Sequence, residues 1–167
     1  NGNINITSKA TITSNTATTA AGGGIYAASG GITIADADIS ENTATTKGGG
    51  ICLNGGTLTI TKGDIKNNTA GTFGGGLHAE SASAKTITLA GDGVFSSNTA
   101  TTCGGGISVS GPITFNTSGT IESNSAKNGG GIYLTGGATM NFNEGMIRYN
   151  RATGTTGSAF TTAYQKT

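Results

Sequence analysis

One stretch of the chain, residues 39–51, reads ISENTATTKGGGI and carries the two motifs that decide the fold. The first motif is an apolar residue followed three positions later by asparagine and five positions later by alanine, as in Ile39, Asn42 and Ala44. The second motif is a glycine triplet followed directly by an apolar residue, as in residues 48–50 and Ile51. Both motifs recur in the same order along the chain, which indicates a repeat.

The glycine triplet occurs at residues 22–24, 48–50, 74–76, 104–106 and 129–131, so that successive triplets begin 26, 26, 30 and 25 residues apart. The asparagine motif recurs with the same period, at Asn15, Asn42, Asn68, Asn98, Asn124 and Asn150. A fixed period of this length is typical of a solenoid, in which each repeat forms one coil and packs only against its neighbours.

Between the two motifs, each repeat has a short run in which apolar and polar residues alternate, as at 32–34 and 58–60. Alternation with period 2 is typical of β-strands. We expect three short strands per coil: one after the triplet, one at the alternating run and one leading into the asparagine. The predicted fold is all-β: a right-handed, single-stranded parallel β-helix, a pectin-lyase-like solenoid of about six coils.

The repeats indicate a single domain over residues 1–167, with coils from about residue 4 to about residue 156. Residues 157–167 predict a degenerate last coil or a fraying end, because Gly157 to Phe160 match the triplet motif only loosely. Open coil ends expose strand edges, which natural proteins normally cover. We therefore expect the chain to be a fragment of a longer solenoid, with neighbouring coils as partners.

The asparagine of each repeat is expected to have a structural role. Stacked coils would place the six side chains above one another, about 4.8 Å apart. Each amide could donate a hydrogen bond to one neighbouring coil and accept one from the other, which satisfies polar groups that would otherwise be buried without partners. The glycine triplets are expected at sharp corners, because glycine tolerates positive φ.

The repeated Gly-Gly-Gly-Ile and Ile/Phe-x-x-Asn motifs resemble the polymorphic outer-membrane protein repeats, in which Gly-Gly-Ala-Ile and Phe-x-x-Asn mark passenger domains of bacterial autotransporters. The resemblance extends from about Ile12 to Phe160. The chain departs from the family pattern in having glycine at the third triplet position, and only Phe95 keeps the aromatic residue before the asparagine. The resemblance implies a non-catalytic adhesin segment at the bacterial cell surface or outside the cell, with a host-cell or surface receptor or a glycan as partner.

The composition argues against several other function classes. A net charge of +1 with 10% charged residues leaves no electrostatic footprint for nucleic acid. No segment approaches the roughly 20 apolar residues that span a bilayer, so we expect no membrane insertion in this segment. No cofactor or metal is expected, since Cys52 and Cys103 lack metal-ligand spacing. The two cysteines lie two coils apart, about 9.6 Å, which is too far for a disulfide.

A candidate binding surface follows from the strand after each triplet and from an insertion in the fourth repeat. The residue after the apolar position is expected to point outward, which forms the column Tyr26, Cys52, His78, Ser108 and Tyr133. Tyrosine is favoured at binding sites. The longer interval between triplets comes from residues 80–85, and a loop inserted into one coil of a solenoid is a frequent binding site. The candidate residues are Tyr26, His78, Glu80, Lys85 and Tyr133.

A glycan-active enzyme is one alternative, because parallel β-helices also include polysaccharide lyases and hydrolases. Asp38 and Asp64 are expected in adjacent coils of one column, where a carboxylate pair could share a proton or bind calcium. No basic residue is expected near this pair. Cys52, His78 and Ser108 fall in successive coils like a nucleophile set, yet no further group is expected to orient the imidazole. Both sets are more simply interpreted as surface.

An ice-binding protein is a second alternative, since a flat threonine array resembles the ice-binding faces of β-helical antifreeze proteins. One outward rank of the alternating runs is expected to contain Thr33, Thr59, Thr88 and Thr114, followed by Asn141. A second rank contains Thr57, Thr86 and Thr139 and is expected to be interrupted by Gly31 and Pro112. The simpler interpretation is that a β-branched residue suits an exposed strand.

Overall fold

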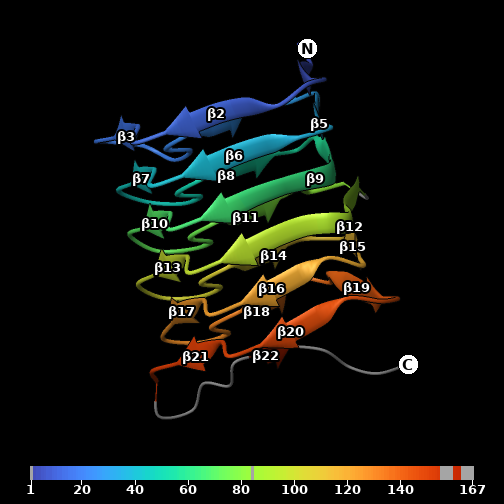
Figure 1. Ribbon diagram of the computed structural model, residues 1–167. Coiled ribbons are helices and arrows are strands. Elements are labelled where there is room, and N and C mark those ends of the chain that lie inside the picture. The colour runs from blue at the N-terminus through green and yellow to red at the C-terminus, as the bar shows by residue number, and fades with distance from the viewer. Residues whose placement is uncertain (1, 84, 155–159, 163–167) are drawn as a thin grey trace.

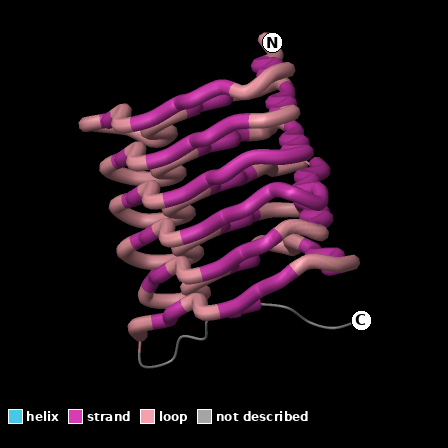
Figure 2. The backbone as a smooth tube through the Cα atoms, viewed as in Figure 1, coloured by secondary structure: helices cyan, strands magenta, loops and turns pink. Residues whose placement is uncertain are grey.

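The chain winds into a stack of coils, each about one repeat long, with the N-terminus at one end of the stack and the described part of the last coil at the other (Figure 1). The computed structural model describes residues 2–83, 85–154 and 160–162. Within these residues the secondary structure consists of strands and turns without helix (Figure 2). Strands pair in parallel with the equivalent strand of the next coil, so residues one repeat apart lie side by side.

The largest of the three sheets, sheet A, contains ten strands. In two coils the alternating run and the segment leading into the asparagine form one long strand, β9 (Thr57–Lys66) and β12 (Lys85–Ser96). In the other coils a bend divides them into two strands. These are β1 (Ile4–Ile6), β2 (Ala10–Thr13), β5 (Gly31–Ile34), β6 (Ala37–Ser40), β15 (Ile113–Thr117), β16 (Thr120–Glu122), β19 (Thr139–Phe142) and β20 (Met146–Arg148).

The other two sheets, B and C, have six strands each. Sheet B consists of two-residue strands directly after each asparagine: β3 (Thr16–Ala17), β7 (Thr43–Ala44), β10 (Thr69–Ala70), β13 (Thr99–Ala100), β17 (Ser125–Ala126) and β21 (Arg151–Ala152). Sheet C contains the strands after the triplets: β4 (Ile25–Ala27), β8 (Ile51–Asn54), β11 (Leu77–Glu80), β14 (Ile107–Ser110), β18 (Ile132–Thr135) and β22 (Phe160–Thr162).

The predicted parallel β-helix is confirmed, with a different distribution of strands over the three sheets. The alternating run and the segment that leads into the asparagine were expected to form two sides of a coil, and they belong to the same sheet. The remaining side is the two-residue strand after the asparagine, which is too short to show a period-2 pattern. Of the expected last coil, residues 155–159 and 163–167 lie outside the described residues, and β22 pairs with β18.

The core lies inside the stack and is formed by alternate residues of sheets A and C. Ile51, Leu77 and Ile107, which follow the triplets, are each at most 1% exposed. Phe95 and Phe115 of sheet A are fully buried in the same core. A separate small cluster of Ala70, Ala100 and Ala126 lines sheet B. Because each coil covers the apolar face of the next, the stack folds as a unit.

The glycine triplets form the corner between sheets B and C, where successive coils approach closely. A Cβ on Gly75 would lie 2.4 Å from the carbonyl oxygen of Gly105 and 2.5 Å from that of Thr99. A Cβ on Gly76, at the third position, would lie 2.7 Å from the Phe95 ring and 2.8 Å from the Gly106 oxygen. Such distances leave no room for a methyl group, which explains why this chain has glycine where the resembling repeats have alanine.

The residue before each of the six repeated asparagines has a left-handed backbone although it is not glycine. These residues have φ of 55° to 58° and are Ser14, Glu41, Asn67, Ser97, Ser123 and Tyr149. This conformation is uncommon for residues with a Cβ. It turns the chain from sheet A into sheet B once per coil, and the variety of residue types at this position hides the turn from sequence reasoning.

The expected register of the threonine ranks is wrong in the fifth coil. Thr114 pairs with Thr86 and Thr139, whereas Asn116 takes the position beside Thr88. The two registers differ by two residues, so both keep the same side chains facing outward. The observed register places Phe115 beside Ile87 in the core and leaves Pro112 before the strand. The second rank therefore runs without interruption through Thr57, Thr86, Thr114 and Thr139.

Candidate functional site

The six asparagines form a continuous ladder of hydrogen bonds along the stack. From Asn15 to Asn124, each Nδ2 donates to Oδ1 of the asparagine in the next coil at 2.9–3.0 Å, and each backbone N–H donates to the same oxygen at 2.9–3.0 Å. Asn98 Nδ2 also donates to the carbonyl of Ile65 in the preceding coil at 2.7 Å. The side chains of Asn42, Asn68, Asn98 and Asn124 are 0% exposed. The ladder is therefore interior and structural, and Asn15, in the first coil, is exposed.

The outward column of sheet C has the expected register but is mostly covered. Tyr26, Cys52, His78, Ser108 and Tyr133 are paired from coil to coil. The expectation of an exposed stripe is wrong for its centre, because Cys52, His78 and Ser108 are only 2–3% exposed. Tyr26 is half-exposed and Tyr133 is half-buried.

The cover is the loop that leads into each glycine triplet and folds back over sheet C. The first glycine of a triplet lies against the column, since a Cβ on Gly48 would be 2.7 Å from Cys52 Cβ. The residues immediately before the triplets form a second column, above the outward column of sheet C, and are joined by single parallel β-bridges. They are Lys47, Phe73, Cys103 and Asn128. The Phe73 ring stacks on the His78 ring at a centroid distance of 5.9 Å and an interplanar angle of 30°. Sequence reasoning missed this column, whose signal is its fixed position before each triplet.

Glu80 orients the His78 imidazole, so the expectation that no group would do so is wrong. Glu80 Oε2 lies 3.2 Å from His78 Nε2 and 2.7 Å from Lys47 Nζ. Burial lowers the pKa of His78, and the hydrogen bond from Lys47 lowers the pKa of Glu80. A neutral imidazole therefore lies beside a Lys47–Glu80 ion pair. His78 Nδ1 is buried and makes no hydrogen bond with any residue that the structure describes.

The cysteines beside this cluster are free thiols, as the coil spacing predicts. Burial, with a smaller contribution from the Glu80 charge, raises the pKa of Cys52 from 9.0 to about 11. Burial also raises the pKa of Cys103. Since the thiolate is the nucleophilic form, Cys52 stays protonated and inert near neutral pH. The set Cys52, His78 and Ser108 thus shares a column without an activated nucleophile.

A hollow of about 90 Å³ opens beside this cluster on sheet C. It is lined by Lys47, Phe73, His78, Glu80, Ser108, Ser110, Tyr133 and Thr135. Of the five candidate binding residues, the fold brings three together here: His78, Glu80 and Tyr133. Tyr26 lies outside the hollow, in β4, and Lys85 begins β12 in sheet A, where its N–H donates to the Pro112 carbonyl at 3.3 Å.

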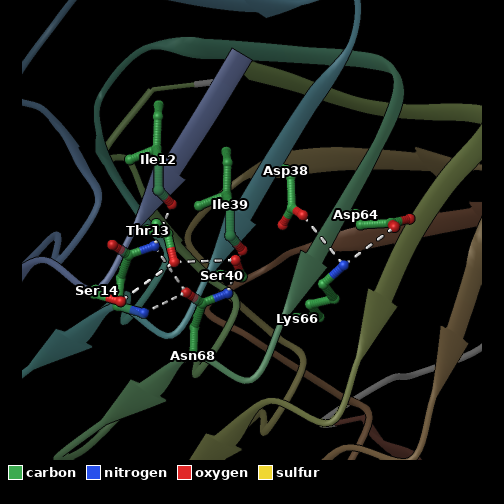
Figure 3. A network of polar contacts seen from close by, with 10 residues as sticks. Ile12, Thr13, Ser14, Asp38, Ile39, Ser40, Asp64, Lys66 and Asn68 are labelled. Carbon is green, nitrogen blue, oxygen red and sulfur yellow. Dashed lines mark hydrogen bonds and ion pairs between the residues drawn. The ribbon is translucent and has the colours of Figure 1, made fainter. Parts of the chain in front are cut away.

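The aspartates considered for catalysis lie in a second hollow, of about 140 Å³, at the bend of sheet A. Asp38 and Asp64 pair across adjacent coils as expected. Lys66 Nζ lies between them, 3.2 Å from Asp38 Oδ2 and 3.5 Å from Asp64 Oδ2 (Figure 3). The expectation that no basic residue gathers near the pair is therefore wrong. Within the described residues, no group of three or more His, Cys, Asp or Glu side chains is placed to hold a metal ion.

Residues 3–167 match the family model described as right handed beta helix region. The chain belongs to this family. No curated protein and no solved structure matches it significantly. Right-handed β-helices occur in adhesins and in glycan-active enzymes alike, so family membership establishes the fold, and the function must be argued from the residues.

The threonine ranks form the outward face of the first half of sheet A in this right-handed β-helix. Thr33, Thr57, Thr59, Thr86 and Thr139 are exposed, and Thr88 and Thr114 are half-buried. Asn116 and Asn141 continue the first rank, and Nδ2 of Asn141 donates to Oδ1 of Asn116 at 2.8 Å. The face is thus an array of hydroxyl and amide groups with one coil between successive members.

No helix in the described part of the chain is long and apolar enough to cross a membrane.

Proposed function

We propose that the chain is a non-catalytic, adhesin-like segment of a β-helix that is displayed on the bacterial cell surface or secreted, and that it presents a binding surface. The observation that carries this proposal is the hollow on sheet C, which brings together His78, Glu80 and Tyr133 beside the aromatic ring of Phe73. Polar groups that converge in a partly aromatic hollow are typical of binding sites. The motif resemblance to autotransporter passenger repeats supports the same class, with a host-cell or surface receptor or a glycan as the partner.

Two features favour binding over catalysis. Asp38 and Asp64 stand side by side in adjacent coils and share the Lys66 ammonium, so they do not face each other across a substrate cleft, as glycoside hydrolysis requires. The raised pKa of Cys52 keeps its thiol protonated beside an imidazole that Glu80 holds in place. The aspartates and the imidazole are thus held by contacts within the stack rather than directed at a substrate.

A binding screen tests the proposal. The purified chain is applied to a glycan array and to intact host cells, with and without calcium, and the glycans are analysed afterwards. We expect saturable binding that leaves the ligand unchanged. Cleavage of a bound glycan would replace the proposal with the glycan-active enzyme, and the absence of binding to both arrays and cells would reject it.

The proposed location is tested separately, on the organism that makes the protein. An antibody against the purified chain should label intact, unpermeabilised cells or detect the chain in the culture medium. Labelling that requires permeabilised cells would place the protein inside and contradict the surface assignment.

Ice binding is a second candidate function, favoured by one observation. The register makes the second threonine rank continuous from Thr57 through Thr86 and Thr114 to Thr139. If this face binds ice, the chain produces thermal hysteresis and Thr59→Tyr abolishes it, because the ring disrupts the flat array. Zero hysteresis in the unmodified chain, or full activity in the variant, rejects this candidate.

A further inference from the structure

We propose that the hollow on sheet C binds a single uncharged sugar residue at the end of a glycan. This inference rests on the proposed function, because it names the place and the ligand class of that binding surface. It follows from the shape of the hollow, the chemistry of its walls and its charge.

The shape comes from the size of side chains in three successive coils. Sheet C presents two outward columns here: His78, Ser108 and Tyr133 in one, and Glu80, Ser110 and Thr135 in the other. The middle coil contributes only the two serines, whereas the coils on either side contribute larger side chains. Equivalent backbones of the two outer coils are about 9.6 Å apart. The serines therefore form the floor of a gap between two walls.

The walls are aromatic at both ends of this gap. One wall contains the Phe73 ring, which is stacked on His78, and the other contains the half-buried Tyr133. The loop residue of the middle coil is Cys103, which is smaller than Phe73 and leaves the gap open between them. A sugar ring has an apolar C–H face that packs against aromatic rings, and its edges carry hydroxyl groups. The aromatic rings of the walls can pack against this face, and the hydroxyls of Ser110 and Thr135 can form hydrogen bonds with the edges.

The polar groups of the hollow can both donate and accept hydrogen bonds. The half-buried hydroxyls of Ser110 and Thr135 each have one donor and two acceptor positions, whereas Ser108 is buried and closes the bottom of the hollow. Glu80 contacts Lys47 and His78 through Oε2 alone, and within the described residues Oε1 makes no hydrogen bond. Lys47 Nζ has three donors and uses one on Glu80. This mixture suits vicinal hydroxyl groups, each of which is a donor and an acceptor.

The charge of the hollow selects a neutral ligand. Lys47 and Glu80 neutralise each other at 2.7 Å, and the buried His78 is uncharged because burial lowers its pKa. An acidic sugar would place a second carboxylate beside Glu80, with Lys47 as one cation for two negative charges. The hollow, with a volume of about 90 Å³, is smaller than a whole pyranose ring, so it takes only part of one terminal sugar and excludes a chain of several.

Saturation-transfer NMR and titration calorimetry test the inference with methyl glycosides of neutral hexoses and N-acetylhexosamines, and with methyl glucuronide as the acidic comparison. We expect saturable binding of at least one neutral glycoside, and binding of the glucuronide at least tenfold weaker. Ser110→Phe, which fills the gap, and Tyr133→Ala, which removes a wall, should each weaken binding at least tenfold. Tyr26→Ala changes an exposed tyrosine of the same column outside the hollow and should leave affinity unchanged.

Circular dichroism and the Tm of each variant establish that it is folded before its affinity is compared. Equal affinity of the Ser110 and Tyr133 variants and the unmodified chain would overturn the site, while the proposed binding function would stand. Binding to host cells without binding to any glycoside would overturn the ligand class alone. Absence of binding to glycosides, arrays and cells would overturn both this inference and the proposed function.

Discussion

Asn68 donates its side-chain amide to Oδ1 of Asn98 at 3.0 Å, although the two residues are 30 positions apart in the chain. The other ladder neighbours are 26 or 27 positions apart. The additional residues of the fourth coil lie in the bend between β11 and β12 and in the irregularity of β12 between Leu89 and Asp92. Insertions are thus accommodated at sheet edges and bulges, while the ladder keeps the coils in register.

Removing one ladder side chain should destabilise the stack strongly. Asn98→Ala deprives the buried Nδ2 and N–H of Asn68 of their acceptor and leaves the Ile65 carbonyl without its donor. We expect the free energy of unfolding to fall by about 3 kcal/mol or more, because buried polar groups lose their partners. Urea denaturation measures this loss.

The matched control for the ladder is Asn15→Ala in the first coil. Asn15 is exposed, and Asn42 Oδ1 still accepts the backbone N–H of residue 15 after the change. Its cost should stay below about 1 kcal/mol, the usual worth of an exposed hydrogen bond. Equal losses for the two variants would show that the ladder does not stabilise the interior.

A methyl group at the middle of a glycine triplet should not be tolerated. In Gly75→Ala the new Cβ would lie 2.4 Å from the Gly105 oxygen, and the backbones of residues 75 and 105 are each hydrogen-bonded to the coils on both sides, so neither can move away. We expect a loss of about 2 kcal/mol or more in the free energy of unfolding, from overpacking. Gly91→Ala is the control, because nothing lies within 4 Å of its Cβ position. A stable Gly75 variant with an unchanged Tm would contradict the close approach of the coils.

Both cysteines should resist modification by thiol reagents in the folded chain. With a pKa of about 11, Cys52 has roughly one thiolate per thousand molecules at pH 8, and burial limits access further. A thiol reagent such as DTNB should therefore react slowly with the native chain and release two equivalents after denaturation. Rapid reaction of the native chain, or fewer than two thiols after denaturation without reductant, would contradict the assignment of two buried free thiols.

Stability should decrease as the pH falls from 7.5 to 5.5. The folded-state pKa of His78 lies below its ordinary value of 6.5, so the unfolded chain binds the proton first and acid favours unfolding. The pKa of Glu80 is also lowered, and its stabilising contribution is lost only below its ordinary 4.5, outside this window. Urea midpoints at the two pH values measure the effect. His78→Gln should remove it, since the chain has no other histidine, and an unchanged slope would assign the effect to other groups.

The sequence predicts part of the candidate site. His78, Glu80 and Tyr133 can be named from the column after the triplets and from the inserted loop. Lys47 and Phe73 share a fixed position before a glycine triplet, but the loop that places them over sheet C has no alternation and no apolar period to show which way their side chains point. Their positions depend on how closely the glycine corners of adjacent coils approach, which is a property of the stack.

The sequence by itself determined the parallel β-helix and the six ladder asparagines. Apolar residues, glycine triplets and asparagines that share one period can all be satisfied only when the coils stack in parallel, so the pattern specifies the architecture. Only the tertiary structure decided that Thr114 stands beside Thr86 and that Lys66 bridges Asp38 and Asp64. A register slip of two residues preserves the alternation of strand faces, so the pattern is the same in both registers. The packing of Phe115 beside Ile87 selects one of the two registers. The Lys66 bridge depends on the reach of a long side chain between coils, which the alternating pattern does not show.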